Sequence, residues 1–484
     1  MTRSPVATDE ATCFQDPCAT VTASTPHHTH NRELWYTRWG AAAFVLALFV
    51  VVRSISVLIP PFQSPDEVNH ILRAYTLAHG DLLPVRQGDD AGDAVDTGLL
   101  EYTNHYSALP FDYSAKQNRT LLDRTQNIKW TSKRVFSDFS NTAVYFPIPY
   151  APQALAIRIG ETLRWTVADT YALARLFSLA ATLAIILSAL ILYPVPLFMA
   201  GILLLPMTLF QMASASMDSV CFAISLLAAS SFMRGADPTF RFGPCMHAIL
   251  TLSLLVLATV RQNLLLFTLL PAALYPIRRS NLYFISAGAG FLLAVLWAFY
   301  LTHNFSLPSP YNVTAADAIK LYLTHPQMLF RMLLKTFSNP TVLVFYRDSF
   351  IGVLGGLDTP LGINAYRFLT VLLVLLACVT IRWNREHILR PPVVSLVAGG
   401  LVAIAMLFFL LLIAWTPPQA PFIQGVQGRY FIPLIALSGF PLFQAELSPM
   451  GTKLGIFILL ALFLVSLTSI DSALVDRFWL GDRS

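Results

Sequence analysis

The sequence has little charge. Asp, Glu, Lys and Arg together make up 12% of its 484 residues, whereas ordinary globular domains contain roughly 25%. Hydrophobic residues make up 55%, and the mean hydropathy is +0.60. This composition excludes a soluble enzyme, a disulfide scaffold, a disordered chain and a nucleic-acid-binding module as descriptions of the whole protein. It suits a chain whose main solvent is lipid.

Cysteine is also scarce, and several familiar motifs are missing. The five cysteines show no spacing typical of a metal site. The sequence contains no Walker A loop, dinucleotide fingerprint, HExxH motif or nucleophile elbow, which removes the usual support for ATP-driven transport, redox and protease functions. The net charge of +5 is usual for a membrane protein with basic cytoplasmic loops, and it predicts no nucleic-acid partner.

Long apolar runs are what the sequence does have, and they predict an all-α polytopic membrane protein. A helix needs about 20 apolar residues to cross a hydrocarbon core of roughly 30 Å. About eleven runs approach this length, and we expect residues 39–470 to form a single transmembrane domain. The runs lie at 39–59, 171–193, 195–213, 219–233, 245–260, 263–277, 281–301, 364–381, 392–415, 429–446 and 453–470.

Basic residues predict the orientation of these spans, because Lys and Arg gather in loops that stay in the cytoplasm. Residues 1–38 form a polar tail that we expect to be disordered and cytoplasmic. With the tail on that side, every short basic loop is cytoplasmic as well. The same topology places segments 61–170 and 303–360, and a short C-terminal tail at 471–484, on the outer face of the membrane.

Segment 61–170 is predicted to be a polar subdomain. It contains 23 of the charged residues in a chain that has 32 Lys and Arg and 27 Asp and Glu. Apolar periodicity within it predicts amphipathic helices lying on the membrane surface at Val68–Leu83 and Tyr150–Leu163. A further surface or re-entrant helix is expected near Pro326–Thr336 in the second outer segment.

The sharpest local feature is the stretch PPFQSPDE at residues 60–67, directly after the first span. Its prolines end the helix and hold the chain extended. Asp66 lies beside a second carboxylate at the membrane boundary, where partial desolvation and a like charge favour a general base. Glu67 has an equally good structural explanation, as the acid of a capping box for the helix that follows. His70 and Arg73 lie further along that helix.

Three other polar groups interrupt or border apolar runs. Asp218 lies at a tight turn between two spans, Arg261 interrupts the apolar stretch 245–277, and Arg429 precedes Tyr430 at the start of the span 429–446. Taken singly, each is equally well explained by snorkelling or by a structural ion pair. Their predicted convergence on one leaflet with Asp66 indicates a shared cavity. Carboxylates beside arginines suit an anionic phosphate ligand and a hydroxyl group that loses its proton.

Several motifs, in chain order, resemble the bacterial membrane-protein family catalogued as domain of unknown function 2142. The matching stretches cover nearly the whole chain. They are PPFQSPDE with HILRAY at residues 60–75, LPMTLFQMASASMD at 205–218, FIGVLGGLDT at 350–359 and GVQGRYFIP at 425–433. The stretch ATVRQN at 258–263 departs from the family pattern, so the resemblance does not extend to Arg261.

The layout of this family resembles the GT-C superfamily of glycosyltransferases, which place a catalytic acid in the first outer loop and use polyprenyl-phosphate sugar donors. The resemblance implies that Asp66 is the base, with Glu67 as its partner or as a ligand of a divalent metal. From the residues themselves, we expect Arg429, with Arg261 as a second candidate, to hold the donor phosphate, while apolar spans bind the isoprenoid tail. The other substrate-binding candidates are His70, Arg73, Asp218, Asp358 and Tyr430.

The resulting hypothesis is a glycosyltransferase of the bacterial inner membrane with a cytoplasmic N-terminus. It transfers a sugar from a polyprenyl-phosphate donor to a cell-envelope glycan or lipid on the outer face. Within the enzyme class, an O-antigen polymerase or ligase is an alternative. Outside it, the alternatives are a transporter for lipid-linked glycans and a non-catalytic assembly protein of an envelope polysaccharide machine.

Overall fold

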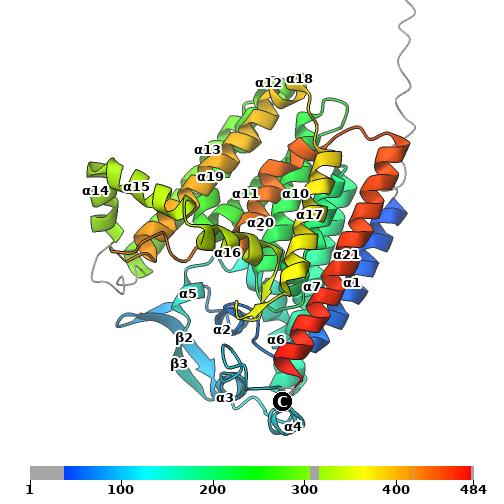
Figure 1. The fold of residues 1–484 in the computed structure, drawn as a ribbon. Helices are drawn as coiled ribbons and strands as arrows, with labels where there is room; N and C mark the ends of the chain where they lie inside the picture. Colours follow the sequence, from blue (N-terminus) through cyan, green and yellow to red (C-terminus); the bar gives the residue numbers. More distant parts are fainter. Residues whose placement is uncertain (1–37, 306–314, 418, 481–484) are drawn as a thin grey trace, which may run out of the picture.

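Long apolar helices dominate the structure (Figure 1). It is a computed structural model that describes residues 38–305, 315–417 and 419–480. Within those ranges, seven helices are long and apolar enough to cross a membrane. This architecture confirms the predicted all-α polytopic membrane protein. The seven are α1 (Arg38–Leu58), α7 (Val167–Leu192), α10 (Asp218–Ala236), α13 (Leu282–Phe305), α17 (Ile363–Thr380), α19 (Pro391–Ala414) and α21 (Pro449–Phe478).

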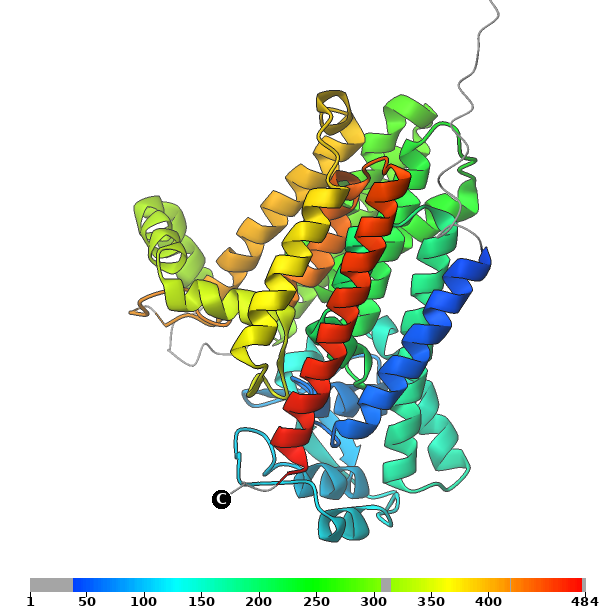
Figure 2. The same ribbon diagram turned by 45° about the vertical axis from the view of Figure 1, so that its right-hand side comes forward.

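Helix α10 is the central element of the bundle. In its apolar stretch 83% of the residues are buried, whereas the share does not exceed 39% in the other six helices. It packs against α7 and against the shorter helix α11 (Pro244–Val260), and α21 packs against α17 and α1 (Figure 2). Helix α10 is rich in Ala and Ser, and such small side chains allow helix backbones to approach closely in a membrane.

The four other predicted spans are short or irregular helices. Prolines account for much of this irregularity, because proline removes a backbone donor and breaks the regular ladder. The segments around residues 198–217 are fully buried, which suits irregular backbone at membrane depth. The segments are α8 (Leu197–Leu203) with α9 (Pro206–Met212), α11, η2 (Gln262–Leu274) with α12 (Tyr275–Arg278), and the series η3 (Gly428–Tyr430), α20 (Phe431–Leu434), η4 (Ile435–Gly439) and η5 (Phe440–Phe443).

Residues 61–166, between α1 and α7, form a folded unit that we term the loop subdomain. Its three-stranded antiparallel sheet has the order β1-β2-β3, which the sequence did not predict because the strands are short and polar. The elements are α2 (Glu67–Ala78), β1 (Val85–Gln87), β2 (Asp90–Asp96), α3 (Thr97–His105), α4 (Arg119–Thr125), β3 (Arg134–Asp138), α5 (Ser140–Ala143), η1 (Ile148–Tyr150) and α6 (Ala151–Thr162). Helices α2, α3 and α5 pack against β2.

Both predicted amphipathic helices of the loop subdomain are present, but α2 is buried in protein and does not lie on the membrane surface. Helix α2 corresponds to the prediction for Val68–Leu83, yet most of its residues are buried against α6, α5 and β2. It is therefore an interior helix of the loop subdomain, and its predicted place on the membrane surface is wrong. Helix α6 matches the predicted Tyr150–Leu163 and packs against α7.

The second polar segment, near residues 315–362, lies beside the bundle. Helix α15 (Pro326–Phe337) agrees with the prediction near Pro326–Thr336, and it exposes Phe330 and Leu334. This exposure fits a helix in contact with lipid. The remaining elements are α14 (Ala315–Thr324), α16 (Pro340–Ile351), and the strand pair β4 (Val353–Leu354) and β5 (Thr359–Pro360).

The ends of the helices agree with the predicted arrangement of loops. Helix α1 begins at the end of the bundle opposite the loop subdomain, as do α12 and α18 (Arg385–Ile388), whereas α21 ends beside the loop subdomain (Figure 1). Helix α21 continues to Phe478. The prediction that a C-terminal tail begins at residue 471 is therefore wrong for residues 471–478. The predicted cytoplasmic tail, 1–38, lies outside the described residues except for Arg38.

Candidate functional site

Four residues that are far apart in the sequence form a continuous chain of ion pairs, which we term the ion-pair chain. Arg429 is at its centre: Nη2 donates to Oδ2 of Asp66 at 3.0 Å, and Nη1 donates to Oδ2 of Asp218 at 2.8 Å. The other oxygen of Asp218 pairs with Nη2 of Arg261. The two acids and two arginines alternate, so their formal charges cancel.

Each member of the ion-pair chain lies at the end or beginning of an element. Asp66 precedes α2 in a left-handed backbone conformation (φ 60°). Asp218 is the first residue of α10, where the helix dipole favours a negative charge. Arg261 ends α11, and Arg429 lies in the short η3 helix. Helix ends therefore direct four charged side chains toward one point between the loop subdomain and the bundle.

The backbone at η3 is positioned by a close approach to α16. A Cβ atom at Gly428 would collide with the backbone nitrogen of Phe350 and the carbonyl oxygen of Tyr346. The Gly428 nitrogen also donates to the Ser349 hydroxyl at 2.8 Å. The glycine thus lets η3 pack directly on α16, which fixes the position of the next residue, Arg429.

The ion-pair chain is buried at one end and open at the other. The side chain of Arg429 is 5% exposed and that of Asp218 is 11% exposed, whereas that of Asp66 is 41% exposed. The side chain of Arg261 is 18% exposed. The two guanidinium groups have further partners: Arg429 Nε donates to Gln427 at 2.6 Å, and the Tyr430 ring lies 5.0 Å from Arg261 and 5.4 Å from Arg429. Buried charges require such partners. Asp66 is consequently the member that meets solvent.

Neutral polar groups border the ion-pair chain on the side of the loop subdomain. His70 Nδ1 and the Tyr150 hydroxyl are 2.8 Å apart, and the His70 ring stacks near Tyr145. Burial lowers the pKa of His70, although the carboxylates of Asp218 and Asp66 act in the opposite direction. Desolvation raises the pKa of Tyr145 to about 12. At neutral pH, these side chains therefore carry no charge beside the ion pairs.

Comparison with known families supports the resemblance seen in the sequence. The family model described as "Predicted membrane protein (DUF2142)" matches residues 44–438. The chain belongs to this family. The matched region includes all four members of the ion-pair chain. No curated protein and no solved structure matches the chain.

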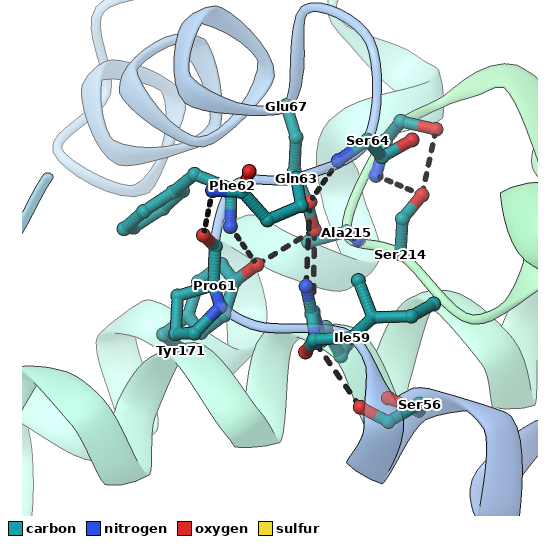
Figure 3. Close-up of polar contacts among 12 residues, drawn as sticks. Ser56, Ile59, Pro61, Phe62, Gln63, Ser64, Glu67, Tyr171, Ser214 and Ala215 are labelled. Atoms are coloured by element: carbon teal, nitrogen blue, oxygen red, sulfur yellow. Dashed lines mark hydrogen bonds and ion pairs between the residues drawn. The ribbon is translucent and has the colours of Figure 1, made fainter. Parts of the chain in front are cut away.

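In this DUF2142 chain, the Glu67 side chain is directed toward Tyr171 and the Ala215 backbone (Figure 3). Its Oε1 accepts from the Tyr171 hydroxyl at 2.7 Å, from Arg175 Nε at 3.2 Å and from the Ala215 nitrogen at 2.7 Å. Its Oε2 accepts from the Ser64 nitrogen at 3.2 Å, but the Ser64 hydroxyl has no hydrogen-bond partner among the described residues and α2 begins at Glu67 itself, so the predicted capping box does not form. The expectation that Glu67 is the partner of Asp66 or a metal ligand is therefore wrong, and Glu67 instead joins the start of α2 to α7 and to the Ala215 backbone.

Arg175 is the important residue that the sequence analysis missed. Its guanidinium binds Glu67 and also donates to the carbonyl oxygens of Ser56, Ile59 and Pro60, so it joins α7 to the segment that leads to Asp66. An arginine within the apolar run 171–193 was the available signal, because ionisable residues at membrane depth are rare and have specific partners.

Two predicted substrate-binding residues have structural contacts instead. Arg73 donates to the carbonyl oxygens of Asp81 and Leu82 at 3.2 and 2.5 Å, and thereby closes the turn that follows α2. Asp358 forms a buried ion pair with Arg477 of α21 at 2.9 Å and accepts from the Phe111 nitrogen at 2.8 Å. Neither residue contacts the ion-pair chain, so the structure does not bring them together with the other candidates.

The described residues do not supply a ligand set for the divalent metal that the resemblance left open. Within 38–305, 315–417 and 419–480, no group of three His, Cys, Asp or Glu side chains gathers in one place. Asp66 and Asp218 each face arginine, and Glu67 is enclosed by donors. The arrangement fits recognition of an anion and proton transfer better than it fits metal coordination.

Proposed function

We propose that this chain is a GT-C-type glycosyltransferase of the bacterial inner membrane. It transfers a sugar from a polyprenyl-phosphate donor to a cell-envelope glycan or lipid on the outer face. The observation that carries the proposal is the exposed carboxylate of Asp66, which pairs with the buried Arg429 at the open end of the ion-pair chain. A base next to fixed positive charge is what transfer to a hydroxyl group and release of a phosphate require.

Asp66 is the general base in this proposal. Its Oδ2 is held by Arg429, and among the described residues no group donates to Oδ1. Oδ1 is therefore available to accept a hydrogen bond from the acceptor hydroxyl. The proton moves to Oδ1 as the hydroxyl oxygen forms its bond to the anomeric carbon. The bond from that carbon to the phosphate oxygen breaks, and its electron pair leaves with the polyprenyl phosphate.

The arginines stabilise the departing phosphate. Nε of Arg261 is buried and has no hydrogen-bond partner among the described residues, so it is a donor already oriented within the site. Arg429 contributes a planar guanidinium that can bind two oxygens together. Such fixed donors act at the place where negative charge develops and need little reorganisation. Tyr430 lies near both guanidinium groups and keeps them in position.

The test is complementation of a deletion strain, with lipid-linked and envelope glycans measured by mass spectrometry. Asp66→Asn keeps the shape of the side chain and removes the basic oxygen. We expect it to reduce the transferred product by about 10²–10⁴-fold. Asp123→Asn is the matched control, because Asp123 is an exposed carboxylate on α4 of the same loop subdomain. It should retain full activity.

Equal amounts of both variants in the membrane are required for the comparison. Full complementation by Asp66→Asn would overturn the proposed chemistry and favour a non-catalytic assembly protein. The transporter alternative predicts a different result, in which the lipid-linked glycan of the deletion strain accumulates on the cytoplasmic leaflet. Labelling intact spheroplasts with a membrane-impermeant reagent distinguishes that location from the outer leaflet.

A further inference from the structure

A cavity of about 310 Å³ lies between α1 and α7, beside the start of the loop subdomain. Its walls are mainly apolar and include Val57, Leu176 and Met212. A volume of this size is within the range of small-molecule sites. Two polar side chains that line it, Arg53 and Gln117, distinguish it from an ordinary gap between helices.

Arg53 is an exposed arginine within a membrane-spanning helix. It lies five residues before the end of α1, and no ion pair or side-chain hydrogen bond joins it to another described residue. A guanidinium at this depth is costly unless an anion or the headgroup region neutralises it. Its position in the wall of a cavity favours a specific anion over general contact with headgroups.

Gln117 is the second unpartnered group. The residue is 6% exposed, and its side-chain Oε1 is buried with no hydrogen bond among the described residues. Its backbone nitrogen, by contrast, is held by the carbonyl oxygen of Phe478 at 2.8 Å. Buried amides nearly always have partners. This amide offers both a donor and an acceptor to whatever occupies the cavity.

The charge of the cavity indicates which anion fits. Arg175 also lines it, but Glu67 neutralises that guanidinium at 3.2 Å. Arg53 is then the single cation without an acid, which matches the single negative charge of a phosphodiester. A polyprenyl monophosphate carries up to two charges and fits less well. A polyprenyl-phosphate sugar is also a singly charged phosphodiester, so its preferential retention in the test below would assign the cavity to the donor. Trp479 Nε1 donates to the Leu58 carbonyl oxygen at 2.8 Å. Because tryptophan is enriched at the membrane–water interface, this end of the cavity is expected at the depth of the lipid headgroups.

We infer that this cavity binds one glycerophospholipid. The phosphodiester lies against Arg53 and accepts from the amide nitrogen of Gln117, and an amine or hydroxyl of the headgroup donates to Gln117 Oε1. The acyl chains follow the apolar surfaces of α1 and α7. The cavity wall includes Pro60 and Pro61, so the lipid supports the segment that leads to Asp66. The inference does not depend on the proposed glycosyltransferase activity.

Mass spectrometry of the purified full chain in mild detergent tests this site. The protein is delipidated, incubated with phosphatidylethanolamine or phosphatidylglycerol, and then analysed for bound lipid in the native state. We expect one lipid to be retained by the wild type, and retention to fall at least tenfold in Arg53→Gln and in Gln117→Leu. Arg367→Gln is the matched control, because Arg367 is an exposed arginine four residues into α17 and does not line the cavity.

Three results would overturn the inference. They are undiminished lipid retention by Arg53→Gln, an equal loss in Arg367→Gln, and preferential retention of undecaprenyl phosphate or of a polyprenyl-phosphate sugar over both phospholipids. The first two would mean that general snorkelling explains Arg53, and the third would assign the site to another ligand. If Arg53→Gln does not fold, lipid retention by Gln117→Leu is compared with that of the wild type instead. Arg53→Lys, which keeps the charge, then serves as the conservative variant at position 53.

Discussion

Arg429 shows how one residue can have a structural and a chemical role together. It is nearly fully buried and holds two carboxylates and an amide oxygen with a single guanidinium. Loss of this group would leave Asp218 with Arg261 as its ion-pair partner and the Asp66 carboxylate without an ion pair among the described residues. A buried carboxylate depends on its ion pairs for stability, so the loss of one of the two arginines that hold Asp218 is expected to destabilise the protein.

We expect Arg429→Lys to lower the free energy of unfolding by about 1–3 kcal/mol, because one ammonium group cannot replace the planar fork. Thermal unfolding in detergent measures this change. Arg158→Lys is the control: Arg158 is 57% exposed and lies 3.8 Å from Glu161, and a surface pair contributes about 0–1 kcal/mol. A destabilised Arg429→Lys protein that binds the polyprenyl-phosphate donor normally, per folded molecule, would remove Arg429 from the donor site.

At the scale of elements, apolar runs located the helices well because lipid requires about 20 apolar residues per span. The run 219–233 became α10 at Asp218–Ala236, and the run 392–415 became α19. The sequence could not predict the 3-10 helix η2 or the irregular segment 428–443. Their form depends on the protein that encloses them and not on their own composition.

The convergence of Asp66, Asp218, Arg261 and Arg429 followed from topology, because each lies at the same end of a predicted span. The directions of individual side chains did not follow. Asp358 lies at that end too, yet it faces Arg477. Sequence position thus predicts which residues share a level of the membrane, but only packing decides which of them meet.

The packing of η3 on α16 provides a prediction at this scale. Gly428→Ala forces a methyl group into the backbone of α16, and we expect lower stability together with loss of the activity that depends on Arg429. Gly288→Ala is the matched change in α13, where a Cβ atom meets nothing within 4 Å. Alanine is a better helix former than glycine by about 0.8–1.0 kcal/mol, so this variant should be at least as stable as the wild type. Unfolding temperatures of the two proteins give the comparison, and equal values would show that η3 moves away from α16 without penalty.

For the molecule as a whole, ion pairs hold the loop subdomain to the bundle at three separate places. Glu67 pairs with Arg175 of α7, Asp66 pairs with Arg429 of η3, and the Asp358–Arg477 pair binds the backbone of Phe111. These contacts fix the subdomain over the ends of α10 and α11, where the ion-pair chain lies. The chemistry proposed here therefore depends on the side of the membrane that this end of the bundle faces.

The orientation of the bundle is open to a direct test. The loop subdomain lies at one end, and α12 and α18, with the basic residues around them, lie at the other (Figure 1). Because basic loops remain in the cytoplasm, reporter fusions after Ser280 and after Glu386 should report the cytoplasm, and a fusion near residue 100 should report the outside. Fusions to alkaline phosphatase and to green fluorescent protein at each position serve as mutual controls, since each is active on one side only. A cytoplasmic residue 100 would place Asp66 on the wrong face for an outer-face donor, and the proposed reaction would fail even though the ion-pair chain itself remained intact.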